Sequence, residues 1–318
     1  MRILISGIHG FVGSNLVRAL RGEHEIYGVD IVAPEKEGVC RTFGWDELEA
    51  GGVPEVDAII HLAGLAHDTK EQEASELYYQ VNRDLTVRMF DYFRAHPGIR
   101  KFLFFSSVKA AAERVEGVLT EEVAATPQGP YGVSKRAAEI YILNALAVSP
   151  EEFRGRGVYV LRPCMIHGPG NKGNLNLLYK VVSRGMPWPL GAFENRRTFT
   201  SVENVCFVVE GLLKGEVDSG IYNVGDDEAL STNELIEEIC ASLGKRAHIW
   251  KLPKGMMEGV ARFSGWIGLP LDPERLRKLT ENYVASNGKI KAALGVERMP
   301  VGAKEGLRET LRSFRNSG

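Results

Sequence analysis

The chain has 318 residues, of which 44% are hydrophobic, and a formal net charge of −2 at pH 7. This length allows a sizeable core in one large domain or two closely joined ones, and the near-neutral charge argues against a nucleic-acid partner. The sequence has no run of eighteen apolar residues and no signal-peptide core, so we expect no membrane insertion and a cytoplasmic location. The four cysteines are scattered without metal-site spacing, so we expect them to be reduced and expect no metal.

Short apolar runs alternate with longer segments of helical periodicity, a pattern that predicts parallel strands joined by crossover helices. The predicted strands of the first half cover residues 2–7, 25–30, 58–64, 101–107 and 157–163. The predicted helices cover residues 11–22, 71–96 and 131–147. We therefore expect an α/β fold with a doubly wound parallel Rossmann sheet, formed by a dinucleotide-binding domain at residues 1–167.

The pattern changes after residue 167. We expect a loop at 167–174, a helix at 175–185 and an irregular stretch at 187–197. A second helix is expected at 202–215 and a strand at 221–225. Ser231, with Glu234 three residues later, predicts a capped helix start, and the chain beyond residue 253 reads as helix and loop. Residues 201–225 are expected to return to the first domain. Residues 168–200 and 226–318 would form a smaller, mostly helical substrate-binding domain.

A glycine loop, GIHGFVG, joins the first predicted strand to the first predicted helix. Its glycines permit a tight turn and leave the backbone N–H groups of a helix N-terminus open to a pyrophosphate. Five residues of the loop are expected to bind a dinucleotide: Gly7, Gly10, Phe11, Val12 and Gly13. Asp30 ends the next strand, near the spacing of a carboxylate that accepts hydrogen bonds from the adenosine ribose. Its charge repels a 2′-phosphate, so NAD is expected as the cofactor.

Tyr131 and Lys135 lie four residues apart on a predicted helix and therefore share one face. A free phenol, with a pKa of about 10, is a poor base at neutral pH, but a nearby ammonium favours the phenolate. The preceding strand ends in Ser106 and Ser107, where ligands bind in open α/β sheets, and a hydroxyl there can orient a substrate oxygen. The pattern predicts proton transfer coupled to hydride transfer.

In their order and approximate spacing, six segments resemble the extended short-chain dehydrogenase/reductase superfamily, in its nucleotide-sugar epimerase, dehydratase and 4-reductase group. These segments are GIHGFVG, HLAGLAH (61–67), VNRDLT (81–86), FFSS (104–107), PYGVSK (130–135) and LRPCMIHGPG (161–170). The resemblance covers essentially the whole chain. It implies that Tyr131 is the catalytic acid and base, that Lys135 assists it and holds the ribose, and that Ser107 orders the substrate.

The resemblance also implies further cofactor contacts, in addition to Tyr131 and Lys135. These would come from Leu62, Ala63, Gly64, Ser106, Pro163 and Cys164. It implies a homodimer in which the helix near 71–96 and the Tyr131 helix of each subunit form a four-helix bundle.

The resemblance places the substrate in the second half of the chain. Arg197, in NRRTF, matches an arginine that clamps the nucleotide diphosphate, and Asn174 with Leu175 matches a pair at the uridine. Both assignments have plainer alternatives: Arg197 as a surface charge and Asn174 as a helix cap. A second clamping arginine would be Arg275 or Arg277, and the sequence does not choose between them.

The chain departs from the family's pattern at several positions. Met165 replaces an asparagine that commonly contacts the nucleotide, and His167 replaces a tyrosine; we expect His167 to be a loop side chain and not a second acid or base. Dehydratase members place Asp–Glu after the catalytic hydroxyl residue, whereas this chain has Val108 and Lys109. Elimination of water is therefore disfavoured, because an apolar side chain cannot act as the acid.

The leading hypothesis is NAD-dependent oxidation and reduction at C4 of a nucleotide-linked hexose, as in a UDP-sugar 4-epimerase. The alternative is an NAD(P)H-dependent 4-ketoreductase of a UDP-4-keto-6-deoxy-N-acetylhexosamine, because SSVK resembles a segment of some such enzymes. Two further readings are a non-catalytic NAD-binding scaffold, which should have lost Tyr131 or Lys135, and a dehydrogenase of apolar alcohols, which would need no phosphate clamp. The sugar, its nucleotide base and the pathway stay open.

Overall fold

The structure is a computed structural model that describes residues 1–65, 73–171, 173–266 and 273–316. A parallel sheet of seven strands forms its centre, with the order β10-β7-β5-β4-β1-β2-β3. The strands are β1 (Arg2–Ser6), β2 (Glu25–Val29), β3 (Arg41–Phe43), β4 (Ala58–His61), β5 (Lys101–Phe105), β7 (Gly157–Pro163) and β10 (Gly220–Val224). In chain order, β2 and β3 are added on one side of β1, and β4, β5, β7 and β10 are then added on its other side. This reversal is the doubly wound topology that the sequence predicts.

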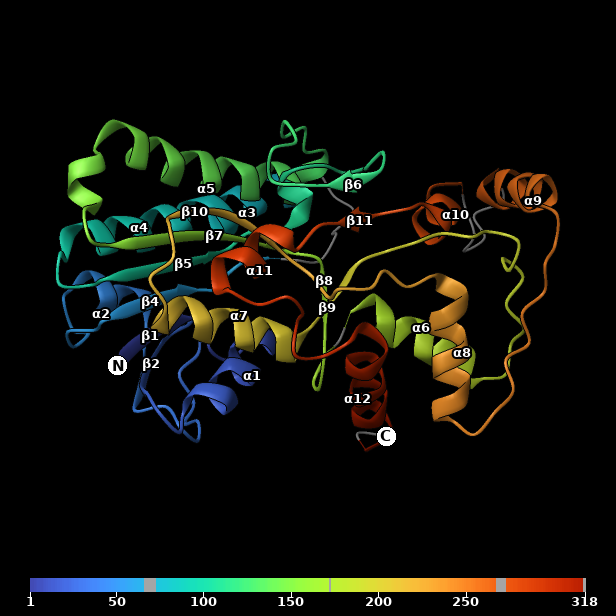
Figure 1. Ribbon diagram of the computed structural model, residues 1–318, viewed down its shortest axis with the longest axis horizontal. Coiled ribbons are helices and arrows are strands. Elements are labelled where there is room, and N and C mark those ends of the chain that lie inside the picture. Colours follow the sequence, from blue (N-terminus) through green and yellow to red (C-terminus); the bar gives the residue numbers. More distant parts are fainter. Residues whose placement is uncertain (66–72, 172, 267–272, 317–318) are drawn as a thin grey trace.

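Helices cover both faces of the sheet because its strands are apolar on both sides. In β5, Leu103 and Phe105 pack into one core, and Phe102 and Phe104 pack into the other. The first core is closed by α1 (Phe11–Leu20), α7 (Val202–Lys214) and α11 (Gly288–Leu294). The second is closed by α2 (Trp45–Glu49), α4 (Leu85–Ala95) and α5 (Gly129–Val148). Figure 1 shows α1 and α7 on one side of the sheet, opposite α4 and α5.

The second half of the chain adds a smaller, mostly helical region beyond the carboxyl ends of the strands (Figure 1). Its own core is formed mainly by α6 (Asn174–Ser183), α8 (Thr232–Ser242) and α12 (Ala303–Asn316). Its outer part contains α9 (Lys254–Trp266) and α10 (Pro273–Thr280). Two short parallel ladders complete it, β8 (Met165–His167) with β9 (Phe199–Ser201) and β6 (Val118–Leu119) with β11 (Val284–Ala285).

Most predicted elements are confirmed, including the 131–147 helix as α5 and the 157–163 strand as β7. The helix cap is confirmed as well, because the Ser231 hydroxyl accepts from the Glu234 N–H at 3.1 Å and the Glu234 carboxylate accepts from the Ser231 N–H at 2.8 Å. β3 and α2 lie in a stretch for which we predicted no element. β10 joins the main sheet beside β7, although the division of the chain into two domains stays a prediction.

The predicted helix at 71–96 is not a single α-helix. Residues 66–72 lie outside the described part of the chain, and from there α3 (Glu73–Tyr78) passes into a π-helical segment, Tyr79–Asp84, before α4 begins. Within the π segment, the Asn82 amide accepts from the Leu65 N–H at 2.8 Å and donates to the Leu65 carbonyl at 3.1 Å. A π segment replaces the regular i to i−4 hydrogen bonds of an α-helix by i to i−5 bonds, and such segments are frequent at functional sites. None of the described helices is long and apolar enough to cross a membrane.

Candidate active site

The glycine loop packs against the chain that follows β4. Gly7 has a φ of +69°, and a Cβ there would lie 2.9 Å from the Ala63 backbone nitrogen. A Cβ at Gly13 would lie 2.6 Å from the Gly7 carbonyl oxygen, so neither position accepts a side chain. Gly10 is the N-cap of α1, and Phe11 and Val12 form its first turn. The loop is thus a side-chain-free cradle at a helix N-terminus, which fits the diphosphate of a dinucleotide.

Asp30 lies beside this cradle, directly after β2. Its carboxylate accepts the backbone N–H of His9 at 3.0 Å and that of Ile31 at 2.8 Å. The first of these bonds fixes the carboxylate against the glycine loop. Asp30 is therefore placed where the sequence predicts a partner for the adenosine ribose.

Lys135 is buried, and its ammonium group donates to the Phe105 carbonyl oxygen at 2.9 Å. A Cβ at Gly64 would lie 2.8 Å from the Lys135 Nζ, so the lysine lies against the backbone of the 62–64 segment. Burial lowers the pKa of Lys135 to about 8, and the neighbouring Glu139 carboxylate acts in the opposite direction. The helix α5 and the predicted cofactor-lining segment therefore meet at this ammonium group.

Ser107 and Tyr131 are brought together by a close backbone contact. A Cβ at Gly132 would lie 2.5 Å from the Lys109 carbonyl oxygen, so the turn after Ser107 packs directly on the first turn of α5. Ser107 is buried and caps a 3₁₀ turn, accepting the Lys109 N–H at 3.2 Å. The Tyr131 ring lies edge to face with the Tyr78 ring, at 6.2 Å between centroids. The three predicted catalytic residues thus gather at the carboxyl end of β5.

Ser106 has a different environment from Ser107. Its hydroxyl donates at 2.6 Å to Glu139, which is fully buried and accepts two further hydrogen bonds from Arg162 at 2.8 and 2.6 Å. This network joins β5, α5 and β7 next to the predicted catalytic residues. Glu139 had no predicted role, because nothing in a residue 23 positions from Arg162 signals the pairing. The predicted contact of Ser106 with the cofactor stays a prediction.

A second buried network supports the 62–64 segment. His61 Nδ1 is bonded to the Ser6 hydroxyl at 2.6 Å and its Nε2 to the Thr86 hydroxyl at 3.0 Å, while the Ala63 N–H donates to the same Ser6 oxygen at 3.3 Å. Burial lowers the pKa of His61 to about 3, so the ring is neutral at pH 7. His61 and the Asn82 amide described above belong to segments that carried the family resemblance, but the sequence alone assigned them no role.

The two arginines of NRRTF, Arg196 and Arg197, have different surroundings. Arg196 is exposed and donates to the Glu234 carboxylate at 2.9 Å. Arg197 is half-buried, and its backbone N–H pairs with the Leu230 carbonyl at 2.9 Å. Burial lowers the pKa of the Arg197 guanidinium, and the Glu281 carboxylate acts in the opposite direction. Arg197 is thus the inward arginine of the pair, as the predicted phosphate clamp requires.

Other predicted contacts are placed as follows. Pro163 ends β7, and the Cys164 thiol is buried, which raises its pKa to about 12. Leu175 is buried in the core of the helical region, and α6 begins at Asn174, one residue earlier than expected. The side chains of Asn174 and Arg275 lie outside the described part of the structure. Arg277 Nε lies 3.6 Å from a Glu281 carboxylate oxygen.

The expectation that His167 is a loop side chain is wrong. His167 belongs to β8, is 1% exposed, and its Nδ1 is bonded to the Thr310 hydroxyl at 2.9 Å. Its Nε2 lies 3.6 Å from an Asp226 carboxylate oxygen. The physical reason is that α12 packs over the β8–β9 ladder and covers the ring. Met165, two residues earlier, packs against the same helical core.

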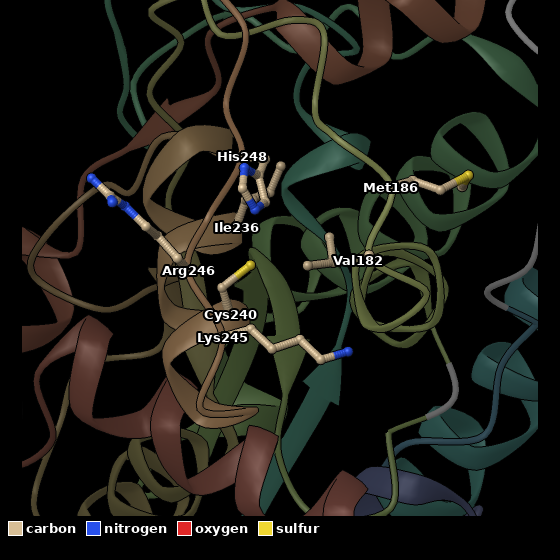
Figure 2. Close-up of a pocket in the computed structure, with 8 residues that line it drawn as sticks. Val182, Met186, Ile236, Cys240, Lys245, Arg246 and His248 are labelled. Atoms are coloured by element: carbon tan, nitrogen blue, oxygen red, sulfur yellow. The ribbon is translucent and has the colours of Figure 1, made fainter.

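A cavity of about 340 Å³ lies between α6 and α8, away from these residues. Figure 2 shows Ile236 and Cys240 of α8 on one side of it and Val182 of α6 on the other, with Lys245, Arg246 and His248 also among the lining residues. None of the predicted catalytic, cofactor or substrate residues lines it. The candidate active site is therefore the region around Tyr131 and not this cavity.

Residues 3–225 match the family described as the NAD dependent epimerase/dehydratase family. The chain belongs to that family. Family members are NAD-dependent enzymes, so NAD is the cofactor, and the cradle of Gly7, Gly10 and Gly13 stays the predicted place for its diphosphate.

Similar proteins include both epimerases and reductases. The chain is 30% identical over 269 residues to the UDP-glucose 4-epimerase of Vibrio cholerae, covering 79% of this chain and 78% of that one. It is 27% identical over 253 residues to the GDP-6-deoxy-D-mannose reductase of Pseudomonas aeruginosa, covering 74% and 78%. The solved UDP-glucose 4-epimerase of Thermus thermophilus, in complex with NAD, matches over 100% of both chains with a TM-score of 0.74 at 24% identity, which shows a shared fold.

The shifted pKa of Lys135 predicts how the stability of this family member depends on pH. From about pH 8 to the ordinary value of 10.5, the unfolded chain binds more protons than the folded chain does, so the free energy of unfolding should rise with pH. Lys135→Met should flatten that rise in urea denaturation of the NAD-free protein. Lys214→Met is the control, because the Lys214 pKa is raised to about 12 and titrates outside the window. Equal slopes for wild type and Lys135→Met would contradict the prediction.

Proposed function

We propose that the enzyme oxidises and reduces C4 of a nucleotide-linked hexose and that it is a UDP-sugar 4-epimerase. The observation that carries this proposal is the buried Lys135 ammonium, held between the Phe105 carbonyl and the Gly64 backbone, one helical turn from Tyr131. A cation fixed at that position stabilises a phenolate on the same face of α5. The chain thereby provides a base beside its NAD site.

Each residue of the site has a task in this reaction. Lys135 stabilises the Tyr131 phenolate, which takes the proton of the C4 hydroxyl and becomes a neutral phenol, and Ser107 hydrogen-bonds the same sugar oxygen. The bound nicotinamide supplies hydride acceptance and return. Arg197 binds the diphosphate through charge-assisted hydrogen bonds, which leaves the hexose free to turn between the two hydride transfers. Tyr131 then returns the proton to the C4 oxygen.

The surroundings of Ser107 argue against a dehydratase. Val108 is buried in an apolar cluster, and the Lys109 ammonium pairs with the Glu113 carboxylate at 3.2 Å. Neither side chain is a carboxylic acid of the kind that dehydratase members place there to protonate a leaving hydroxyl. The Vibrio cholerae relative, named as a UDP-glucose 4-epimerase, supports epimerisation and a UDP-linked substrate.

A 4-ketoreductase of a UDP-4-keto-6-deoxy-N-acetylhexosamine is the second candidate. The SSVK segment and the similarity to the Pseudomonas aeruginosa reductase favour it. Incubation with a panel of UDP-hexoses and UDP-4-keto sugars, with the products identified by NMR, separates the two. An epimerase interconverts C4 epimers with NAD that stays bound, whereas a reductase consumes external NADH and converts only the 4-keto sugars. No conversion of any nucleotide sugar would contradict both.

Arg197→Gln should raise the KM for the UDP-sugar by about tenfold or more, because a hydrogen bond to a charged group contributes about 1.5–3 kcal/mol. Arg196→Gln is the matched control, since its side chain is exposed and already paired with Glu234. Steady-state kinetics of both variants provide the measurement. A KM that Arg197→Gln leaves unchanged would favour an apolar alcohol as substrate, because such a substrate has no diphosphate to clamp.

Three further expectations belong to this proposal: the cytoplasmic location, the two-domain division and the homodimer. The predicted four-helix bundle would use α3, α4 and α5. Leu77 on α3 and Ile140 on α5 are 45% and 43% exposed, so both helices have an apolar side chain that a partner subunit could cover.

A further inference from the structure

Lys36 lies in the segment between β2 and β3 and folds back over the glycine loop. Its neighbours at positions 31–35 are exposed, but Lys36 itself is half-buried. Its ammonium group donates to the Ser14 hydroxyl at 2.7 Å and to the Ile8 carbonyl oxygen at 3.0 Å. Ile8 belongs to the glycine loop and Ser14 to the first turn of α1. A lysine that is distant in sequence therefore places a positive charge at the mouth of the NAD cradle.

This charge has no close counter-ion in the described part of the chain, where no carboxylate is found within 4.0 Å of the Lys36 ammonium. Both hydrogen-bond partners, the Ile8 carbonyl and the Ser14 hydroxyl, are neutral oxygens. Partial burial lowers the pKa of Lys36, the Asp30 carboxylate acts in the opposite direction, and the Arg18 guanidinium repels the ammonium. Withdrawing a cation from water without pairing it is unfavourable, so the site is electrostatically suited to an anion.

The cofactor of this family carries such an anion. The diphosphate of NAD bears two negative charges, and the N-terminus of α1, where Ser14 lies, is where the sequence and the cradle place it. An ammonium group has three N–H donors, and Ile8 and Ser14 account for two of them. The third remains for a charge-assisted hydrogen bond with a phosphate oxygen.

We propose that Lys36 is an additional cofactor-binding residue, whose ammonium group completes the glycine cradle by binding the diphosphate of NAD. The proposal rests on the NAD dependence of the family and not on the sugar chemistry, so its failure would leave the proposed function untouched. The competing explanation is that Lys36 acts only as a structural latch: it holds the 31–38 segment against the loop through its hydrogen bonds to Ile8 and Ser14 and does not contact NAD.

The test measures the NAD dissociation constant of the full-length, NAD-free protein by calorimetry at several salt concentrations. Lys36→Gln keeps hydrogen-bond donors for Ser14 and Ile8 but removes the charge, whereas Lys36→Arg keeps the charge. We expect Lys36→Gln to weaken NAD binding by about tenfold to a hundredfold and to make it less dependent on salt. Lys36→Arg should stay within about threefold of wild type. Lys214→Gln, an exposed lysine on α7 paired with Glu23 and Glu210, should bind NAD as wild type does.

Two results would overturn the proposal. If Lys36→Gln binds NAD as tightly as wild type, the ammonium makes no contact with the cofactor. If both Lys36 variants lose affinity while the salt dependence is unchanged, the lysine acts only as a latch. Thermal unfolding of each NAD-free variant shows separately whether the fold is intact.

Discussion

Tyr131→Phe should lower turnover by about 10³-fold, a far larger change than any in the NAD dissociation constant. The substitution removes only the phenolic oxygen, and a positioned acid–base group typically contributes 10²–10⁴-fold, so the loss should fall on the proton transfer. Steady-state kinetics and NAD titration of the variant provide the measurement. Retention of more than about a tenth of the wild-type turnover would remove Tyr131 from its assigned role and, with it, the mechanism proposed above.

A tyrosine on the same helix provides the control. The Tyr141 hydroxyl donates at 2.6 Å to the Asp91 carboxylate, ten residues along α5 from the site. Tyr141→Phe should keep turnover near that of wild type and change only stability, by about 1 kcal/mol for the lost hydrogen bond. A comparable loss of turnover in both variants would point to a disturbance of α5 and not to chemistry.

Glu139→Gln should lower the free energy of unfolding by about 3–5 kcal/mol. The substitution keeps the shape of the side chain but leaves the Arg162 guanidinium buried without a counter-charge, and breaking a buried pair in this way is strongly destabilising. Urea denaturation gives the value. Because Glu139 also accepts from Ser106, beside Ser107, turnover should fall as well.

A bidentate pair nearer the surface serves for comparison. Arg308 donates two hydrogen bonds of 2.8 Å to Glu238, but its side chain is 57% exposed. Glu238→Gln should therefore cost no more than about 1 kcal/mol. If the two variants unfold at the same urea concentration, burial is not what makes the Glu139–Arg162 pair important.

Local patterns in the sequence were sufficient to predict the sheet and the catalytic helix. Apolar runs bounded by turns mark β1, β5 and β7, and the spacing of Tyr131 and Lys135 requires one helical face. By contrast, β3 has three residues and α2 has five, so neither is long enough to show a period. Such short elements are formed by tertiary packing, which a sequence pattern does not contain.

The candidate site was predictable where one segment contains the whole signal. The glycine loop is such a segment, and its packing agrees with the expected cradle. The remaining features depend on segments that are distant in the sequence. In the sequence, Gly132 is an ordinary helical glycine, and only the structure shows Lys109 packed against it. His167 likewise has the sequence context of a loop residue, and only the structure shows that α12 covers it. Lys36 was not predicted as a site residue for the same reason, because its partners Ile8 and Ser14 are distant from it in the sequence.

The π-helical turn at Tyr79–Asp84 also affects how this chain should be aligned with its relatives. A π turn holds about one residue more than an α turn, so the residues after it are rotated around the axis relative to those before it. A relative in which this turn is regular α-helix would be one residue shorter here, and a gap-free comparison would then match Asn82 with a side chain on another face. The side chain that occupies the same point in space, next to Ser134, is the one to compare.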